Sequence, residues 1–129
     1  HEITTQLRKL KRRDKDIEEY KAQITELTEI SQGLVYYSMT IQNQNISQIG
    51  KQGIRQLLAS FKVIDEKYSE RLENYDLNPS QSLFCILYHI GKSDEEVMQI
   101  LQYSLSNIRV RKSRIKSDTG AESFDDIIS

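Results

Sequence analysis

Residues that end helices are scarce in this chain, and their scarcity constrains the fold more than any other feature. Pro79 is the only proline, and the five glycines are Gly33, Gly50, Gly53, Gly91 and Gly120. Proline and glycine are the residues that most disfavour a helix interior, so helix is favoured almost everywhere between them. The sequence therefore predicts an all-α chain. Its 129 residues allow one ordinary domain with an appendage and exclude a large multi-domain enzyme.

The first third of the chain carries a thin apolar stripe. Apart from a gap at Asp14, apolar side chains recur there at spacings of three and four: Ile3, Leu7, Leu10, Ile17, Tyr20, Ile24, Leu27, Ile30 and Leu34. This spacing is typical of a coiled-coil seam. A helix with so narrow an apolar face is not stable alone in water, so we expect a homodimer formed through residues in 3–49. Parallel pairing and fold-back of the stalk both remain open. Tyr36, Tyr37 and Met39 further along this helix are expected to pack in the core or in the dimer.

A change of composition follows. The stretch QNQNISQIGKQG, residues 42–53, is rich in amides and glycine and predicts a hinge near 43–53. A second amphipathic helix is then indicated by Ile54, Leu57, Leu58, Phe61, Ile64, Tyr68 and Leu72, and it should end before NYDLNP. We interpret residues 1–76 as a helical stalk that dimerises.

The last third contains specific helix-start signals. Asn78 suits an N-cap, Pro79 the first helical position and Gln81 the reciprocal capping position, so a helix should run from there to Ile90 and stop at Gly91. Ser93 and Glu96 predict a second capping box and a short helix to Leu101. Ser104 should cap a third helix that stops at Gly120. A last short helix should fold Phe124 and Ile127 back onto the bundle.

The third of these helices is crowded with cations. From Leu105 to Asp118 it holds five cations and one anion, although the whole chain has a net charge of -1. With Ile108 and Ile115 facing inward, a helical wheel places these residues outward: Ser106, Arg109, Val110, Ser113, Lys116 and Ser117. Arg111, Lys112 and Arg114 flank the buried line, from where their long side chains could reach phosphates.

Two helices joined by a short turn, with the second one cationic, are typical of a helix-turn-helix that places its second helix in the major groove of DNA. Ser106 and Ser113 are small enough for close approach, and Arg109 could form a bidentate contact with guanine. The alternative is a solvated cationic face on an ordinary helical bundle, which has about equal weight on charge alone.

The segment Leu77 to Gly120, LNPSQSLFCILYHIGKSDEEVMQILQYSLSNIRVRKSRIKSDTG, resembles the LuxR-type helix-turn-helix DNA-binding domain. The matching positions are Leu77, Pro79, Gly91, Ser93, Glu96, Val97, Leu101, Ser104, Ile108, Ile115 and Gly120. The resemblance implies a four-helix domain over residues 77–129, base contacts by Arg109, Val110 and Ser113, and phosphate contacts by Asn107, Lys112 and Lys116. Together with the wheel, it gives Ser106, Arg109, Val110 and Ser113 as base-facing, and Asn107, Arg111, Lys112, Arg114 and Lys116 as phosphate-facing.

Several residues depart from the family pattern. Asn78 replaces threonine, Gln81 and Ser82 replace an acidic pair, and Asp118 with Thr119 replaces lysine and leucine. Met98 stands where the family has alanine, and a larger side chain there alters the spacing of the two helices. The anion at Asp118 subtracts from phosphate attraction. These departures keep a second hypothesis open, in which a degenerate helix-turn-helix serves as a protein-interaction or oligomerisation module of a signalling protein.

The segments FKVIDEKYSERLENYDLNPSQSLFCILYHIGKSDEEV and VRKSRIK are also similar to the C-terminal region of membrane-associated regulators with tetratricopeptide or sensor domains upstream. The resemblance implies a signal-linked transcription regulator whose membrane helix and sensor domains precede this segment. The basic run RKLKRR agrees with a preceding membrane helix, but it is equally explained by Asp14, Asp16, Glu18 and Glu19 one turn later.

Few residues could support catalysis or metal binding. His1, His89 and Cys85 are the only histidines and cysteine, which gives no zinc-site spacing, and no nucleophile has a base and an orienting partner in sequence. We therefore expect no enzyme activity, cofactor, metal or small-molecule substrate. His89 is expected to be a packing or surface residue and Cys85 a buried one. The lone cysteine and the lack of any long apolar run fit a cytoplasmic location.

Overall fold

The computed structural model describes residues 2–129, with side chains described from residue 13 onward. It contains seven helices and no strand within that range, which confirms the all-α class. The helices are α1 (Glu2–Ile41), α2 (Gly50–Ile64), α3 (Glu66–Glu73), α4 (Pro79–His89), α5 (Asp94–Leu101), α6 (Leu105–Thr119) and α7 (Phe124–Ile128).

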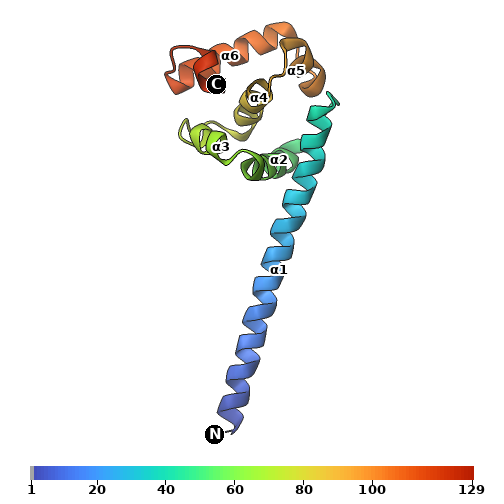
Figure 1. Ribbon diagram of the computed structural model, residues 1–129, viewed down its shortest axis with the longest axis vertical. Coiled ribbons are helices and arrows are strands. Elements are labelled where there is room, and N and C mark those ends of the chain that lie inside the picture. Colours follow the sequence, from blue (N-terminus) through green and yellow to red (C-terminus); the bar gives the residue numbers. More distant parts are fainter. Residues whose placement is uncertain (1) are drawn as a thin grey trace.

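The long helix α1 projects from a bundle formed by the other helices (Figure 1). Only its C-terminal part touches the bundle, where it packs on α2. The chain then turns through residues 42–49, which lie inside or beside the hinge that amide-rich composition predicts. The side chains of Ile3, Leu7 and Leu10, and most of the basic run at residues 8–13, lie outside the described residues.

Two glycines allow α1 and α2 to pack closely. A Cβ atom at Gly33 would overlap the backbone carbonyl of Gln56, and one at Gly53 would meet the side chains of Ile49 and Tyr36. Interiors are packed as densely as organic crystals, so this contact has no room for larger residues. Gly33 is accordingly buried although it lies on the helix that was expected to project as a stalk.

The single helix expected from Ile54 to Leu72 is in fact two helices. The chain breaks at Asp65, whose φ of -139° and ψ of 82° are not helical and whose side chain accepts a hydrogen bond from the Tyr68 backbone N–H. The apolar spacing continues across the break, which is why periodicity alone does not reveal it. The first of the two helices also begins four residues earlier than expected, at Gly50.

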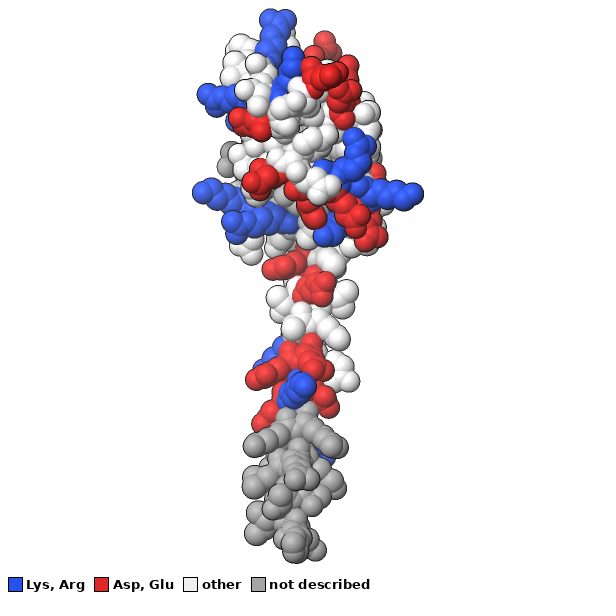
Figure 2. Space-filling view, turned by 90° about the vertical axis from the view of Figure 1, so that its left-hand side faces the viewer, with Lys and Arg blue, Asp and Glu red and all other residues white. Residues whose placement is uncertain are grey.

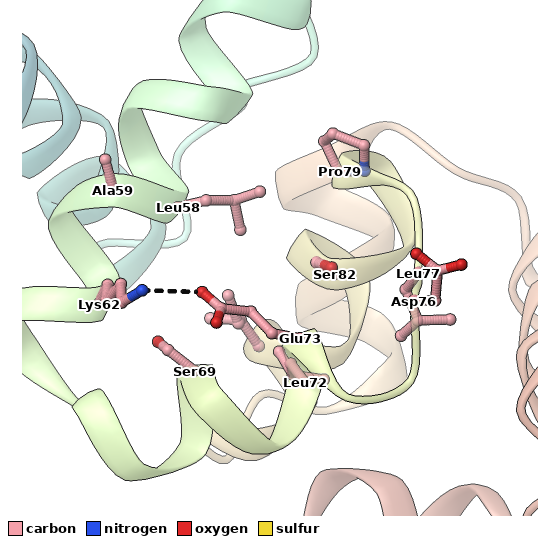
Figure 3. Close-up of a pocket in the computed structure, with 11 residues that line it drawn as sticks. Leu58, Ala59, Lys62, Ser69, Leu72, Glu73, Asp76, Leu77, Pro79 and Ser82 are labelled. Carbon is pink, nitrogen blue, oxygen red and sulfur yellow. Dashed lines mark hydrogen bonds and ion pairs between the residues drawn. The ribbon is translucent and has the colours of Figure 1, made fainter.

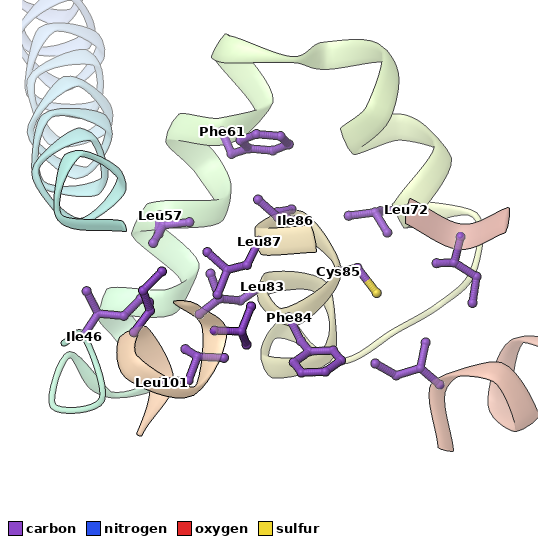
Figure 4. Packing of buried hydrophobic residues seen from close by; sticks show 14 of the residues in the cluster. Ile46, Leu57, Phe61, Leu72, Leu83, Phe84, Cys85, Ile86, Leu87 and Leu101 are labelled. Carbon is purple, nitrogen blue, oxygen red and sulfur yellow. The ribbon is translucent and has the colours of Figure 1, made fainter. Parts of the chain in front are cut away.

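The hydrophobic core surrounds α4. Leu83, Phe84, Cys85, Ile86 and Leu87 are five consecutive buried residues, so this helix is covered on all sides (Figure 4). The surrounding helices and the turn between α1 and α2 contribute the rest of one cluster, which includes Ile46, Leu57, Phe61, Leu72, Val97, Ile100, Ile108, Ile115 and Ile127. Tyr36, Tyr37 and Met39 pack against the same cluster, so their role within the chain is core packing. The cluster is continuous across residues 76 and 77, where a boundary between stalk and domain is expected.

The C-terminal helix α7 is held by side chains from α3 and α4. The Tyr68 hydroxyl donates to the carbonyl of Ile127 over 2.8 Å, and the Arg71 guanidinium donates to the carbonyl of Ser129 over 2.7 Å. His89 stacks on the Tyr68 ring with a centroid separation of 3.5 Å, and its Nδ1 lies 2.6 Å from the carbonyl of Ile128. Phe124 packs on Phe84 and Tyr88, and Ile127 is fully buried, as the sequence predicts.

Candidate nucleic-acid interface

Helices α5 and α6 begin and end where their local signals predict. Ser93 and Glu96 form a reciprocal capping box at the start of α5, and the Ser104 hydroxyl accepts from the Asn107 backbone N–H at the start of α6. Gln102 ends α5 in the left-handed conformation, with a φ of 58°. Residues 102–104 therefore make the tight turn between the two helices, and Gly120 ends α6 at a φ of 70°.

The burial of α6 follows the predicted wheel. Ile108 and Ile115 are buried, at 0% and 1% exposure, and they fix which side of the helix faces the core. The side chains expected on the outward side are all exposed: Ser106, Arg109, Val110, Ser113, Lys116 and Ser117. Arg114 is also exposed, whereas Asn107, Arg111 and Lys112 are half-buried. The four residues expected to face bases thus share one accessible surface.

Arg111 makes two contacts within the domain. Its Nε donates to the Asn107 side-chain carbonyl over 3.0 Å, and its guanidinium lies 4.2 Å from the centroid of the Tyr103 ring. An arginine over an aromatic ring keeps its charge while its planar group is held in place. The charge of Arg111 is therefore oriented, and Asn107 serves here as its acceptor.

Lys112 makes more contacts with other side chains than the sequence suggests. Its ammonium lies 2.8 Å from Oδ1 of Asp94, which also accepts a 2.7 Å hydrogen bond from the Tyr88 hydroxyl. The ammonium also lies 4.5 Å from the Tyr88 ring centroid. The hydrogen bond from Lys112, followed by the one from Tyr88, holds the pKa of Asp94 below its ordinary value. This ion pair links α6 to the start of α5, so Lys112 is less available to phosphates than the other cations of α6.

Three cations of α6 remain free. Among the residues that the structure describes, Arg109, Arg114 and Lys116 have no ion-pair or hydrogen-bond partner for their side chains. Charged groups that are solvated and unpaired attract phosphates without first breaking an internal contact. These three residues carry the electrostatic attraction of the outward face.

Sequence reasoning missed two cations on α2. Lys51 and Arg55 line a hollow of about 380 Å³ with Asn78, the N-cap of α4, and with Pro79 and Ser80, its first two residues. A second hollow, of about 150 Å³, is lined in part by Asn78 and Ser80 and on its other side by Val110, Arg111 and Arg114. The start of α4 is therefore flanked by cations from α2 and from α6. No local signal in the sequence shows this, because the two groups lie more than fifty residues apart.

The charges are distributed unevenly along the molecule. Basic side chains project from the end of the bundle farthest from the start of α1, among acidic ones, while acidic side chains dominate the described part of α1 (Figure 2). Residues 13–30 hold Asp14, Asp16, Glu18, Glu19, Glu26 and Glu29 against Arg13, Lys15 and Lys21. Residues 42–129 hold eleven basic and twelve acidic residues, so any attraction of a polyanion is local to the outward face of α6 and does not extend to the whole bundle.

Two of the departures from the family pattern have structural roles. The Asp118 carboxylate accepts a 3.2 Å hydrogen bond from the Gln81 amide, which ties the end of α6 to the start of α4. Met98 is half-buried against the core on the helix that precedes the turn. Asp118 thus helps to hold the end of α6, and it also reduces the positive charge there.

Another groove lies between α2, α3 and α4, away from the cationic face. It has a volume of about 350 Å³, and Leu58, Leu72 and Leu77 line it (Figure 3). The Lys62 ammonium and the Glu73 carboxylate form a 3.0 Å ion pair across it. Ser69 and Ser82 supply its hydroxyls, and no histidine or cysteine lines it. Among the described residues there is also no group of three metal-ligating side chains.

Comparison with known proteins gives no match, whether with family models, with curated proteins or with solved structures. Within residues 2–129, none of the helices has both the length and the apolar character that crossing a bilayer requires.

Proposed function

We propose that this chain is the DNA-binding output segment of a signal-linked transcription regulator, with α5 and α6 as a LuxR-type helix-turn-helix and the cytoplasm as its place of action. The observation that carries the proposal is the outward face of α6. Arg109, Arg114 and Lys116 are exposed and unpaired there among the described residues, around the small side chains of Ser106 and Ser113. A capped helix that presents small residues and free cations suits a major groove.

In this proposal, different residues contact the bases and the phosphates of DNA. Ser106, Arg109, Val110 and Ser113 face bases, and the surrounding cations hold the backbone. Arg114 and Lys116 contact phosphates directly, while Arg111 does so from its place over the Tyr103 ring. Asn107 holds the Arg111 guanidinium in place and does not contact phosphate itself. Lys112 contacts phosphate only when its ion pair with Asp94 breaks. Lys51 and Arg55 add a second phosphate contact across the start of α4.

A salt series tests the proposal. Fluorescence anisotropy measures binding of the chain to a pool of random-sequence duplexes, for the wild type and for Arg109→Ala, Lys116→Ala and the control Lys67→Ala. Lys67 is an exposed cation on α3, so the control removes one charge away from α6. We expect Arg109→Ala to weaken binding and Lys116→Ala to lower the slope of log K against log salt by about 1, with Lys67→Ala close to wild type.

A second candidate function is a protein-interaction module on the same scaffold. The Lys112–Asp94 pair and the anion at Asp118 favour it, because both reduce the charge that α6 offers to DNA. A folded chain that binds no duplex at low salt in the anisotropy experiment would contradict the DNA proposal and support this candidate.

A further inference from the structure

The described part of α1 carries an apolar line that no described residue covers. Its side chains are exposed to between 43% and 64%: Ile17, Tyr20, Ile24, Leu27, Leu34 and Ile41. They fall at the a and d positions of a heptad, with Ile17 and Ile24 at a and Tyr20, Leu27, Leu34 and Ile41 at d, whereas the next two a positions are Ser31 and Ser38. An apolar line of this length on a polar helix marks an interaction surface.

The bundle leaves this line free because it uses another face of α1. Gly33 and Thr40 are buried on the side of the helix that packs on α2, and Tyr36 is half-buried there. At 100° per residue, Leu34 and Ser38 point roughly 100–140° away from Gly33. A second helix can therefore lie along the a and d positions without displacing α2.

The residue types favour two parallel strands. Isoleucine at a with leucine at d is the combination that favours parallel dimers, and it occurs at Ile24 and Leu27. The heptad positions g and e flank the a and d positions. In two parallel, aligned helices, each g residue lies beside the e residue five positions later on the partner. These pairs are Asp16 with Lys21, Gln23 with Thr28, and Ile30 with Val35. One pair is oppositely charged, one is polar and one is apolar, so none opposes the alignment.

An antiparallel pair over the same line is less favourable. It would place Asp16 beside the partner's residues 42–45, which are all amides and offer no cation. It would also put the two α6 helices at opposite ends of the dimer, because α6 lies at the end of the molecule away from the start of α1 (Figure 1). This second consequence bears only on binding to one duplex, and so it rests on the proposed DNA-binding function.

We infer that α1 pairs with α1 of a second copy as a parallel, in-register, two-stranded coiled coil over residues 17–41. The bundles then lie outside the coiled coil, with both α6 helices toward the same end. The pairing is carried by α1 alone; only its use in presenting two α6 helices to one duplex rests on the proposed DNA-binding function.

Disulfide trapping tests the alignment. Tyr20→Cys and Ser38→Cys, each with Cys85→Ser, are made on chains with tags of different size and then mixed and oxidised. Parallel pairing puts each cysteine opposite its own copy, residue 20 in a d layer and residue 38 in an a layer, so we expect disulfides of residue 20 with 20 and of 38 with 38. An antiparallel pair over the same segment puts residue 20 opposite residue 38, so disulfides that join these two residues would overturn the inference.

Sedimentation equilibrium tests the stoichiometry. We expect the wild type to be a dimer and Leu27→Glu to shift it to a monomer, because the charge enters the d position. Thr25→Glu adds the same charge at an exposed position away from the seam and should remain a dimer. A wild-type monomer, trimer or tetramer would overturn the inference. A dimer that binds no duplex would contradict only the DNA proposal, and a monomer that binds duplex would contradict only the coiled coil.

Discussion

The side-chain amide of Asn43 donates a 2.9 Å hydrogen bond to the carboxylate of Glu96, which forms the capping box of α5. The same side chain accepts a 2.6 Å hydrogen bond from Lys92, whose ammonium also contacts the carbonyl of Ile41. Nearby, the Ile46 N–H donates to the Ile100 carbonyl over 2.9 Å. The end of α1 and the turn that follows it are therefore attached directly to α5 by hydrogen bonds.

Asn43→Ala should lower the free energy of unfolding by about 1–2 kcal/mol, because it removes these bonds and places alanine at a φ of 58°. Urea denaturation measures the change. Asn43→Gly removes the same bonds but tolerates the positive φ, so it should lose less. Gln44→Ala, an exposed neighbour, is the matched control and should stay near wild type. Equal stability of Asn43→Ala and wild type would show that the attachment is not stabilising.

Gly33→Ala should destabilise the chain by about 1–3 kcal/mol, because the added Cβ overlaps the Gln56 carbonyl. Helix propensity predicts the opposite sign, a gain of about 1 kcal/mol. The sign of the change in thermal denaturation therefore decides whether the close crossing of α1 and α2 exists. The control Glu29→Ala alters an exposed position one turn earlier and should have little effect.

The Asp94–Lys112 pair should make stability depend on pH in the acid range. The pKa of Asp94 is lowered in the folded state, so the pair contributes stability above the ordinary aspartate pKa of about 3.9 and loses it as pH falls through the folded value. Both side chains are partly exposed, so we expect a contribution of no more than about 1 kcal/mol.

Urea denaturation from pH 6 to pH 2.5 measures this effect. Asp94→Asn should be less stable than wild type at pH 6, and the difference should shrink at the acid end. Glu95→Gln changes an exposed carboxylate in the same helical turn and serves as the control. A difference between Asp94→Asn and wild type that stays constant over the range would contradict the assigned role of the carboxylate.

Cys85 should be unreactive while the chain is folded. Its side chain is 0% exposed, and burial raises the pKa of its thiol to about 12, so almost no thiolate exists at neutral pH. An aromatic disulfide reagent should label it only at the rate of unfolding and at once in denaturant. Rapid labelling of the native chain would show that the centre of α4 is open to solvent.

Signals that lie within one helical turn were predictive in this chain. The caps at Asn78, Ser93 and Ser104 and the stop at Gly91 place α4, α5 and α6 correctly, because each depends on neighbouring residues alone. The wheel likewise identifies the exposed side chains of α6, because Ile108 and Ile115 are buried and fix the rotation of the whole helix.

Features that depend on contacts between distant segments could not be predicted. The break at Asp65 lies inside an unbroken apolar pattern, although aspartate before a first-turn glutamate is a weak N-cap signal. The bond from Tyr68 to the Ile127 carbonyl joins residues 59 positions apart. From the sequence alone, Gly33 is expected only to destabilise α1, and its packing role depends on the contact with α2. Lys51 lies near the cations of α6 only because the fold brings α2 beside the start of α4.

The most direct test of the proposed interface measures how the backbone amide chemical shifts change when DNA is added. A ¹⁵N-labelled chain is titrated with a random-sequence duplex at low salt, and the changes are mapped onto the helices. We predict the largest changes at Ser106, Arg109, Val110 and Ser113, with a second group near Lys51 and Arg55. No change at any of these positions, or changes confined to α1, would contradict DNA binding by the outward face of α6.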